Sequence, residues 1–442
     1  MSEAATPTGR TDRIAMLDTT RGIAVLGILL MNITSFGLPN AYDDPTNWGG
    51  SSGANLAAYR IMALFFEGTM RGLFTLLFGA SALLFLQRHT TRDPGLRPAD
   101  LYFRRTMWLI VFGMINGYVL LWDGDILFSY GVVGMFLFVF RNIPPRRLLI
   151  VAAIALSMQT VMFTLDRADF IASRDEAAAA EVQQAAGATL SAGQLQAIEN
   201  FKEAREDYKP SPETLTATIA GMRSNYLGVL ADVKDRTYFV ETTFFIRYGF
   251  MECLGMMLLG MVLFRFGVLT GHASTRTFMM FAVVGYAIGL PINVFELIGV
   301  ERGGFSTESI LTSYLTYDAG RIPTTLGHVG VIGLLCHTTA LAAMKRTLAA
   351  VGQMALSNYL TQSVLCMILF TGVGFALYGQ LQRAELYYVV AAIWLVQLIW
   401  SPWWMRRYQF GPAEWLWRSL TYGKRQPMRL TPQPTPASLP IA

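Results

Sequence analysis

Long apolar stretches recur along this chain from one end to the other. Runs of about 18 or more apolar residues are typical of helices that cross the hydrocarbon core of a bilayer. Hydrophobic residues make up 53% of the 442 residues and charged residues only 15%, a balance that soluble domains seldom show. The sequence therefore predicts an all-α, polytopic integral membrane protein.

Windows of apolar residues predict about ten membrane-spanning helices. Their expected ranges are 17–37, 58–86, 105–121, 124–140, 146–165, 243–265, 276–298, 322–344, 351–377 and 386–405. The third and fourth ranges meet at the short segment Trp122-Asp123-Gly124-Asp125, which predicts a helical hairpin with an acidic tip.

The spans fall into two groups around one long polar segment. Residues 1–165 are expected to form an N-terminal membrane bundle of about five spans, and residues 243–405 a C-terminal bundle of about five more. Residues 166–242 between them are rich in Ala, Glu, Gln and Lys, which predicts a helical insertion outside the membrane, its first part being either helical or disordered. Residues 406–442 form a basic tail.

Basic residues gather in alternate loops, beginning with Arg10 and Arg13 and ending with the tail. Short loops rich in Lys and Arg stay on the cytoplasmic side of a membrane. With ten spans, every basic loop falls on one side. The pattern therefore predicts that both termini are cytoplasmic and that residues 166–242 are external.

Several spans carry ionisable or amide side chains where most membrane helices are apolar. Such groups usually face the bundle interior or a water-filled cavity, because their burial in hydrocarbon is costly. The sequence predicts a polar chamber open to the outside, and a purely structural pairing of the same charges is the alternative. The candidate residues are Asn32, Glu67, Arg71, Arg247, Glu252, Arg321 and His328.

Two spacings within this set suggest roles. Glu67 and Arg71 are four residues apart, which favours a pair on one helical face. Arg321 and His328 are seven residues apart, nearly two helical turns, so Arg321 could bind an anionic acceptor while His328 removes its proton. We therefore take His328, Glu67 and Arg71 as the catalytic candidates, and the others as substrate-binding candidates. The alternative for His328 is a hydrogen bond to a neighbouring span that only helps packing.

A second polar group is expected near the cytoplasmic side. Asn358 and Gln362 share a helical face early in the ninth span, and we add them to the substrate-binding candidates. Asp18 and Arg21 open the first span and are better explained as a helix cap and a snorkelling arginine. Neither metal-ligand spacing nor a phosphate-binding glycine loop occurs in the sequence, so we predict no metal site.

Several stretches resemble a known family. "RIAMLDTTRGIAVLGILLMNI", "FFEGTMRGLFTLLFGAS" and "WDGDILFSYGVVG" resemble the N-terminal half of the YeiB-like bacterial membrane proteins. "VGQMALSNYLTQS" and "FGPAEWLWRSLTYGKRQPMR" are similar to the domain of unknown function 418. The resemblance covers nearly the whole chain apart from residues 166–242. It implies a multi-pass protein of the bacterial cytoplasmic (inner) membrane.

This family is grouped by resemblance with transmembrane acyltransferases, which share an opening Leu-Asp-x-x-Arg-Gly pattern and use a histidine in the first outer loop. That loop has no histidine here, and Asn116 stands where many relatives have one. If the resemblance implies acyl transfer, His328 or the pair Glu67 and Arg71 must supply the chemistry.

Three functions follow as hypotheses. The first is transfer of an acyl group from a cytoplasmic acyl-thioester, with acyl-CoA as the donor, to an external glycan, lipid headgroup or small metabolite. The second is a transporter or permeation protein for a small polar solute, and the third is a non-catalytic membrane scaffold. We expect membrane lipid as a partner, no nucleic acid, and leave a homodimer open.

Overall fold

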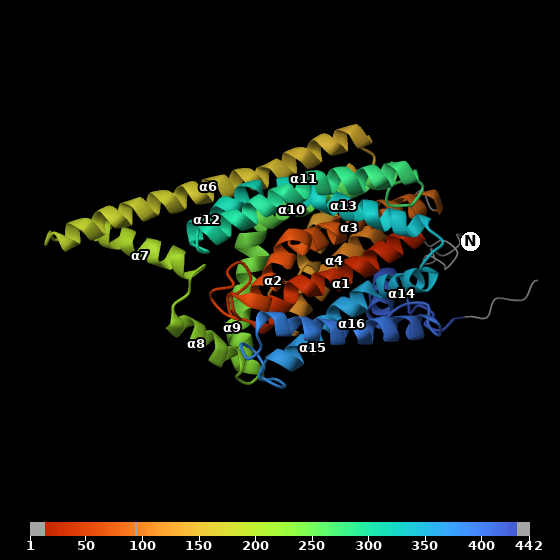
Figure 1. Cartoon of the computed structure of the whole chain (residues 1–442). Coiled ribbons are helices and arrows are strands. Elements are labelled where there is room, and N and C mark those ends of the chain that lie inside the picture. The colour runs from red at the N-terminus through yellow and green to blue at the C-terminus, as the bar shows by residue number, and fades with distance from the viewer. Residues whose placement is uncertain (1–13, 93–94, 431–442) are drawn as a thin grey trace, which may run out of the picture.

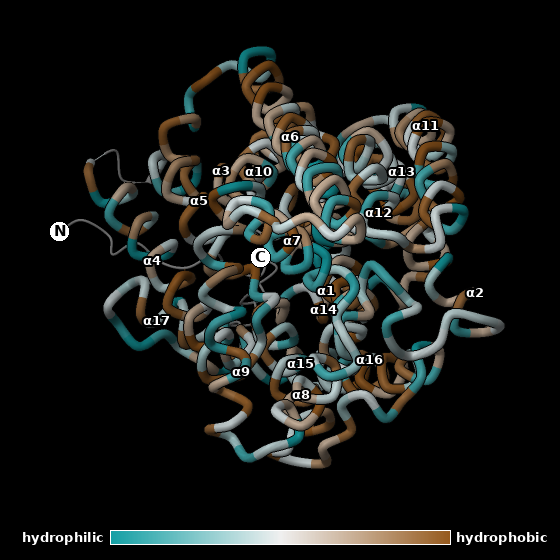
Figure 2. The backbone as a smooth tube through the Cα atoms, turned by 90° about the vertical axis from the view of Figure 1, so that its left-hand side faces the viewer, coloured by the Kyte–Doolittle hydropathy of each residue, from teal (hydrophilic) through white to brown (hydrophobic). Residues whose placement is uncertain are grey.

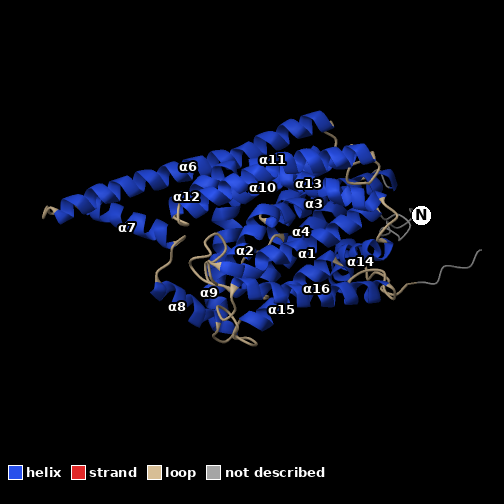
Figure 3. Cartoon of the chain, in the orientation of Figure 1, coloured by secondary structure: helices blue, strands red, loops and turns tan. Residues whose placement is uncertain are grey.

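The computed structural model describes residues 14–92 and 95–430, and it shows a bundle of helices without strands in those residues (Figure 3). One isolated antiparallel bridge joins Tyr408 to Arg429. Arg10 and Arg13, on which part of the orientation argument depends, lie outside the described residues.

The chain order of the helices is simple. The first are α1 Ala15–Gly37, α2 Gly53–Ile61, η2 Met62–Phe66, α3 Thr69–Arg92, α4 Arg97–Tyr118, α5 Leu127–Phe140 and α6 Pro145–Ala185. Then come α7 Ala192–Glu206, α8 Pro212–Met222, α9 Tyr226–Phe239, η3 Val240–Gly249, α10 Phe250–Arg265 and α11 Thr275–Arg302. The last are α12 Thr307–Ser313, η4 Tyr314–Thr316, α13 Tyr317–His337, α14 Ala342–Gln353, α15 Ala355–Phe370, α16 Arg383–Met405 and α17 Pro412–Tyr422.

Six helical stretches of the described chain are long and apolar enough to cross a membrane. They are Ala15–Gly37, Gly53–Thr91, Pro145–Ala185, Tyr226–Arg265, Thr275–Arg302 and Arg383–Met405. Helices α5 and α15 are apolar but shorter. The chain is thus all-helical with six candidate spans. Each of the ten expected ranges overlaps a helix, but the count of ten stays a prediction.

The bundle has two unlike ends, which serve here as landmarks. Helix α14 lies at one end, and α7 and α8 project beyond the other (Figure 1). Viewed end-on, apolar stretches run along peripheral helices such as α5, α11 and α16 (Figure 2). This pattern suits helices that present apolar side chains to lipid.

Two long helical stretches run from the bundle towards α7. Helix α6 continues unbroken for 41 residues, and α9, η3 and α10 form a second continuous stretch of 40 residues. The expected break at Lys209 and Pro210 falls between α7 and α8. Helix α7 begins with a capping box in which Ser191 and Gln194 satisfy each other's backbone N–H groups.

Helix α14 differs from expectation, because the eighth and ninth spans were expected to run to 344 and from 351. Instead α13 ends at His337, and α14 is a separate helix that crosses α1. The crossing is close: a Cβ on Gly22 would lie 2.0 Å from the Leu348 carbonyl oxygen, and one on Gly352 would lie 1.9 Å from that of Asp18. Glycine at both positions permits this backbone contact.

The second span is broken where its polar residues begin. Glu67 has an extended ψ of 123°, and Gly68 has a φ of +66°, between η2 and α3. A side chain at Gly68 would also meet Arg321, whose Cδ would be 2.3 Å from the new Cβ. The break frees backbone carbonyls, and the Thr69 hydroxyl donates to that of Phe65 at 2.8 Å. Gly68 therefore serves a turn between η2 and α3.

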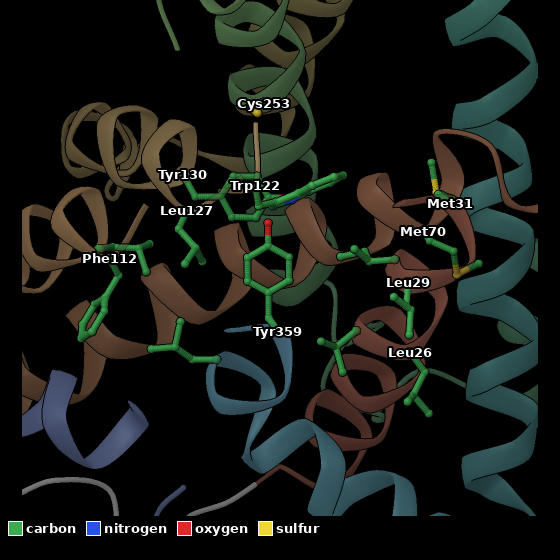
Figure 4. Close-up of a cluster of buried hydrophobic side chains, with 14 of the residues drawn as sticks. Leu26, Leu29, Met31, Met70, Phe112, Trp122, Leu127, Tyr130, Cys253 and Tyr359 are labelled. Atoms are coloured by element: carbon green, nitrogen blue, oxygen red, sulfur yellow. The ribbon is translucent and has the colours of Figure 1, made fainter. Parts of the chain in front are cut away.

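The core lies where α1, α3, α15 and the α4–α5 hairpin meet. Figure 4 shows the Tyr359 hydroxyl of α15 directed towards Trp122 at the hairpin tip. Leu29 of α1 and Tyr130 of α5 are also fully buried. The predicted acidic hairpin is present, and its Asp125 accepts hydrogen bonds of 2.8 Å from the Asn116 side chain and the Phe128 backbone.

Candidate functional site

A cavity of about 220 Å³ lies at the α14 end of the bundle, and we call it the arginine cavity. Its charged and polar wall consists of Asp18, Arg21, Ser81, Arg88, His89, Arg105, Gln353, Glu414 and Arg418. Its apolar wall includes Phe78, Phe85, Leu109, Leu356 and Trp417. Four guanidinium groups thus share an otherwise largely apolar space with two carboxylates.

Both carboxylates are already engaged. Asp18 accepts from Arg21 at 3.0 Å and from the Gln353 amide at 3.1 Å. Glu414 accepts from the backbone N–H of Leu356 at 2.7 Å and from the hydroxyl of Ser357, so it caps α15. Burial raises the pKa of the Glu414 carboxyl, and these hydrogen bonds oppose the rise.

Arg105 has no carboxylate partner among the described residues. Its guanidinium lies instead over aromatic faces, 3.7 Å from the Trp417 ring centroid and 5.3 Å from that of Phe85. Cation–π contact compensates only part of a charge held away from water. The cavity is therefore suited to an anion.

Helix α17 covers this cavity. The Trp417 indole donates to the Arg105 carbonyl at 2.9 Å, and Tyr422 donates to Nε2 of His89, 3.0 Å away. The other ring nitrogen of His89 donates to the Phe85 carbonyl, which fixes the neutral tautomer. His89 was expected in a solvated loop, but it is buried under α17.

A smaller pocket of about 70 Å³ lies nearer the α7 end, and we call it the carboxylate pocket. Its ionisable and polar wall consists of Thr34, Tyr42, Asp43, Tyr59, Glu67, Asn293, Glu296, Ser313, Tyr314, Arg321 and Arg383. Three carboxylates here face two guanidinium groups, the reverse of the balance in the arginine cavity.

Arg321 organises this pocket. Its guanidinium lies between two carboxylates, 3.9 Å from Glu67 and 3.4 Å from Glu296, and its carbon is 3.2 Å from the centroid of the Tyr317 ring. Tyr42 donates a short hydrogen bond to Glu67. The left-handed turn at Gly68 is what lets the Arg321 side chain pass so close to α3.

A hydrogen-bonded column connects the two sites along α3. Tyr130, which lines the arginine cavity, shares a hydrogen bond with Thr75, and Thr75 donates to the Arg71 carbonyl at 2.8 Å. The Arg71 guanidinium donates at 2.8 Å both to Glu252 and to the Tyr317 hydroxyl. Tyr317 in turn donates to Glu67 at 3.3 Å, in the carboxylate pocket.

The pairing expected between Glu67 and Arg71 is therefore replaced by two pairings across helices. Arg71 pairs with Glu252 of α10, and Glu67 pairs with Arg321 of α13. The i,i+4 rule holds only within one regular helix, and the turn at Gly68 interrupts the helix between the two residues.

His328 lies outside both pockets. Its Nε2 donates to the Phe65 carbonyl at 2.8 Å, and its Nδ1 accepts from the Tyr286 hydroxyl at 2.7 Å. Both ring nitrogens are thus engaged by neighbouring helices, which favours the packing explanation over the acid–base one. The imidazole satisfies a carbonyl that the break in the second span has freed.

The remaining candidate residues from the sequence do not lie together in one pocket. Asn358 donates to Ser401, and Gln362 donates to Gln397, in a buried network that ties α15 to α16 and lines neither pocket. Arg247 is exposed and pairs with Asp166. Asn32 is partly buried beside Met31, and Met31 rather than Asn32 lines the carboxylate pocket. In the described residues, no group of three metal-binding side chains occurs.

Comparison with known proteins shows the family to which the chain belongs. Residues 263–424 match the family model described as "Protein of unknown function (DUF418)". The chain is 30% identical over 418 residues to "Uncharacterized protein YeiB" of Escherichia coli, covering 93% of this chain and 96% of the relative. The chain belongs to the YeiB-like DUF418 family.

A second relative agrees with this assignment. The chain is 29% identical over 432 residues to "Uncharacterized protein YxaH" of Bacillus subtilis, covering 96% of this chain and 97% of the relative. No solved structure matches the chain. The DUF418 match spans α11 to α17, so it includes Arg321 and the helix that covers the arginine cavity, but not α3.

Sequence reasoning missed most of the arginine cavity. Arg88, His89 and Arg105 had been counted only as loop residues, although Arg21, Ser81 and Arg88 meet at one end of α1 and α3. The available signal was spacing: Ser81, Phe85 and Arg88 recur every three or four residues and so share one face of α3.

Proposed function

We propose that this YeiB-like protein transfers an acyl group from a cytoplasmic acyl-thioester to an acceptor held on the opposite side of the membrane. The observation that carries the proposal is the arginine cavity, where four guanidinium groups meet apolar walls. An acyl-CoA has matching chemistry, because its phosphates are anionic and its acyl chain is apolar. The carboxylate pocket is then the acceptor site.

The distance between the sites suits such a transfer. Phe74, in the wall of the arginine cavity, lies five residues after Thr69, the first residue of α3, about 7 Å of helical rise, and Glu67 lies just beyond the turn that precedes α3. The thioester C–S bond breaks while a C–O or C–N bond forms on the acceptor. The Glu67 carboxylate takes the acceptor's proton and passes it to the departing thiolate, so that the donor leaves as a thiol towards the cytoplasm.

The proposal includes a topology. We place about ten helices across the bacterial inner membrane, with both termini and the arginine cavity on the cytoplasmic side and α7 outside. Single cysteines at Ala185 and Arg425, in a chain whose native cysteines are serine, test this. An impermeant thiol reagent added from outside should label Ala185→Cys but not Arg425→Cys, and the opposite pattern would reverse the topology.

The decisive experiment follows radiolabelled acetyl-CoA in proteoliposomes. Wild-type protein should release CoA and label an acceptor from a bacterial metabolite extract. Arg105→Gln should weaken binding of the donor about tenfold or more, because it removes a cation without an acidic partner. Arg104→Gln is the matched control, since Arg104 is exposed and lies 3.9 Å from Asp100 outside the cavity. Equal loss in both variants, or no acetyl-CoA binding by the wild type, would refute the proposal.

A transporter is the second candidate, and the hydrogen-bonded column favours it. Hydrogen bonds run from Tyr130 to the Arg71 carbonyl and from the Arg71 guanidinium to Glu67, and the Arg71 side chain itself joins these two parts. Such columns carry protons or polar solutes through membrane proteins. In the same proteoliposomes, solute that crosses unmodified while acetyl-CoA stays intact would select transport over acyl transfer.

A further inference from the structure

The carboxylate pocket carries more negative than positive charge, and the excess is localised. Glu67 and Glu296 share one cation, Arg321. Asp43 also lines the pocket, yet it has no ion pair among the described residues. Arg383 also lines the pocket but forms no ion pair with Asp43 among the described residues; its guanidinium donates to the Ala41 carbonyl and lies 5.3 Å from the centroid of the Tyr59 ring.

Aromatic rings surround the same space. Tyr42, Tyr59 and Tyr314 all line the pocket with Asp43. The face of an aromatic ring carries partial negative charge, so several rings around a carboxylate suit an organic ammonium ion. An anionic ligand would instead meet repulsion from the carboxylate of Asp43.

One residue of the pocket wall also has a buried side-chain oxygen. Asn293 lines the pocket and is only 3% exposed, and its Oδ1 has no hydrogen-bond partner among the described residues. This oxygen lies beside α13, where a Cβ on Gly320 would be 2.2 Å from it. The other end of this amide is used, since Nδ2 donates to the Leu64 carbonyl at 2.8 Å.

We propose that the carboxylate pocket binds a small organic ammonium ion, held by Asp43 and Glu67 and enclosed by the three tyrosine rings. A volume of about 70 Å³ admits a molecule of only a few heavy atoms, because one water needs about 10–15 Å³ on this measure. The inference rests on the proposed function in one respect: there, the ammonium compound is the acyl acceptor. The binding itself requires no acyl chemistry.

Three probes of similar size and different charge test the proposal on purified full-length protein. Ethanolamine is a cation, ethylene glycol is neutral and glycolate is an anion. Titration calorimetry should detect ethanolamine binding and no binding of the other two at the same concentration. Equal binding of ethylene glycol, or tighter binding of glycolate, would overturn the proposal without any variant being made.

A variant then locates the site. Asp43→Asn keeps the size of the side chain but removes its charge, so ethanolamine should bind about tenfold or more weakly. Glu301→Gln is the control, because Glu301 pairs with Arg60 outside the pocket. Unchanged binding by Asp43→Asn would place the ammonium elsewhere. Because no acyl donor is present, ethanolamine binding can succeed while acetyl-CoA turnover fails, and the reverse, so the two proposals fail separately.

Discussion

The arginine cavity and the carboxylate pocket both lie along α1 and along the second span, the cavity at α3 and the pocket at η2 and Glu67, and they have opposite charge balances. Among the described residues, Arg105 in the cavity has aromatic faces for partners and no carboxylate. In the same part of the chain, Asp43 in the pocket has tyrosines around it and no ion pair. The bundle thus has an excess of positive charge in one cavity and of negative charge in the other.

A pair of opposite charges separates the two sites. Between them lies the Arg71–Glu252 pair, hydrogen-bonded to Tyr317. Each charge in this pair compensates the other, so the layer itself attracts neither kind of ion. A protein with unlike ligands at its two ends needs such a neutral partition, and the following variants test the partition first and the sites afterwards.

Removing one charge of the partition should have the largest effect. Arg71→Met leaves the Glu252 carboxylate unpaired inside the bundle, which should lower the free energy of unfolding by about 3–5 kcal/mol. The yield of folded protein after detergent extraction and its thermal denaturation midpoint measure this. The double variant Arg71→Met with Glu252→Met should recover most of the loss.

Two controls sharpen that result. Arg71→Met combined with Glu67→Gln should not recover stability, since Glu67 pairs with Arg321 instead. Breaking the exposed pair of Arg60 with Glu301 should leave the free energy of unfolding almost unchanged, because solvent screens that pair. Recovery by the Glu67 combination would restore the pairing that the sequence spacing suggests.

The turn beside the partition should be the next most sensitive position. Gly68→Ala places a Cβ at a φ of +66° and against the Arg321 side chain, so it should lower stability by about 1–3 kcal/mol. Gly53→Ala is the matched control, because Gly53 has a φ of +54° but open space around it. Similar melting temperatures for the two variants would show that the contact with Arg321 is unimportant.

Acid should weaken binding of a cation in the carboxylate pocket but not binding of an anion in the arginine cavity. Burial and the neighbouring Glu67 raise the pKa of Asp43 to about 6, with a smaller contribution from Asp44, while Tyr314 and Arg321 oppose the rise. Asp43 therefore loses its charge as pH falls from 7.5 to 5, and ethanolamine binding should weaken about tenfold. Asp43→Asn should remove this pH dependence.

Sulfate, an anion whose charge does not change over this range, should bind in the arginine cavity with constant affinity. The arginines of the cavity remain charged throughout. Calorimetry with each probe across the pH series measures both trends. Parallel weakening of the two probes would indicate general loss of structure rather than titration of Asp43.

The smallest effect is expected at His328. His328→Gln keeps a donor for the Phe65 carbonyl and loses only the contact with Tyr286, so stability should fall by about 1 kcal/mol. Turnover of acetyl-CoA should stay within a few-fold of wild type. A folded variant with a 100-fold lower rate would return His328 to the catalytic candidates.

The sequence predicted the helices well because apolar length and turn residues act locally. The hairpin at Trp122, the break near Pro210 and the placement of Glu67 and Arg321 in one polar chamber all follow from such patterns. Partners were harder to predict, because pairing across helices depends on tertiary packing. Arg71 pairs with Glu252, 181 residues away, rather than with Glu67, four residues away.

The arginine cavity was missed for a related reason. Its walls come from α1, α3, α4 and α17, and the sequence does not show that α17 folds back over Arg105. Conversely, Asn358 and Gln362 looked like ligand-binding groups because buried amides are costly, but Ser401 and Gln397 satisfy them.

Helix α6 is the longest helix among the described residues. Its 41 residues span about 60 Å, roughly twice the thickness of a bilayer core, so about half of it extends beyond the membrane. Within the bundle it packs on α10, where a Cβ on Gly255 would lie 2.6 Å from the Leu156 side chain. Because α10 also carries Glu252, one packed helix joins α6 to the Arg71–Glu252 pair. The segment after α7 reaches the carboxylate pocket more directly: Tyr208 packs against the cluster that contains Val300 and Ile310, and both of these residues line the pocket.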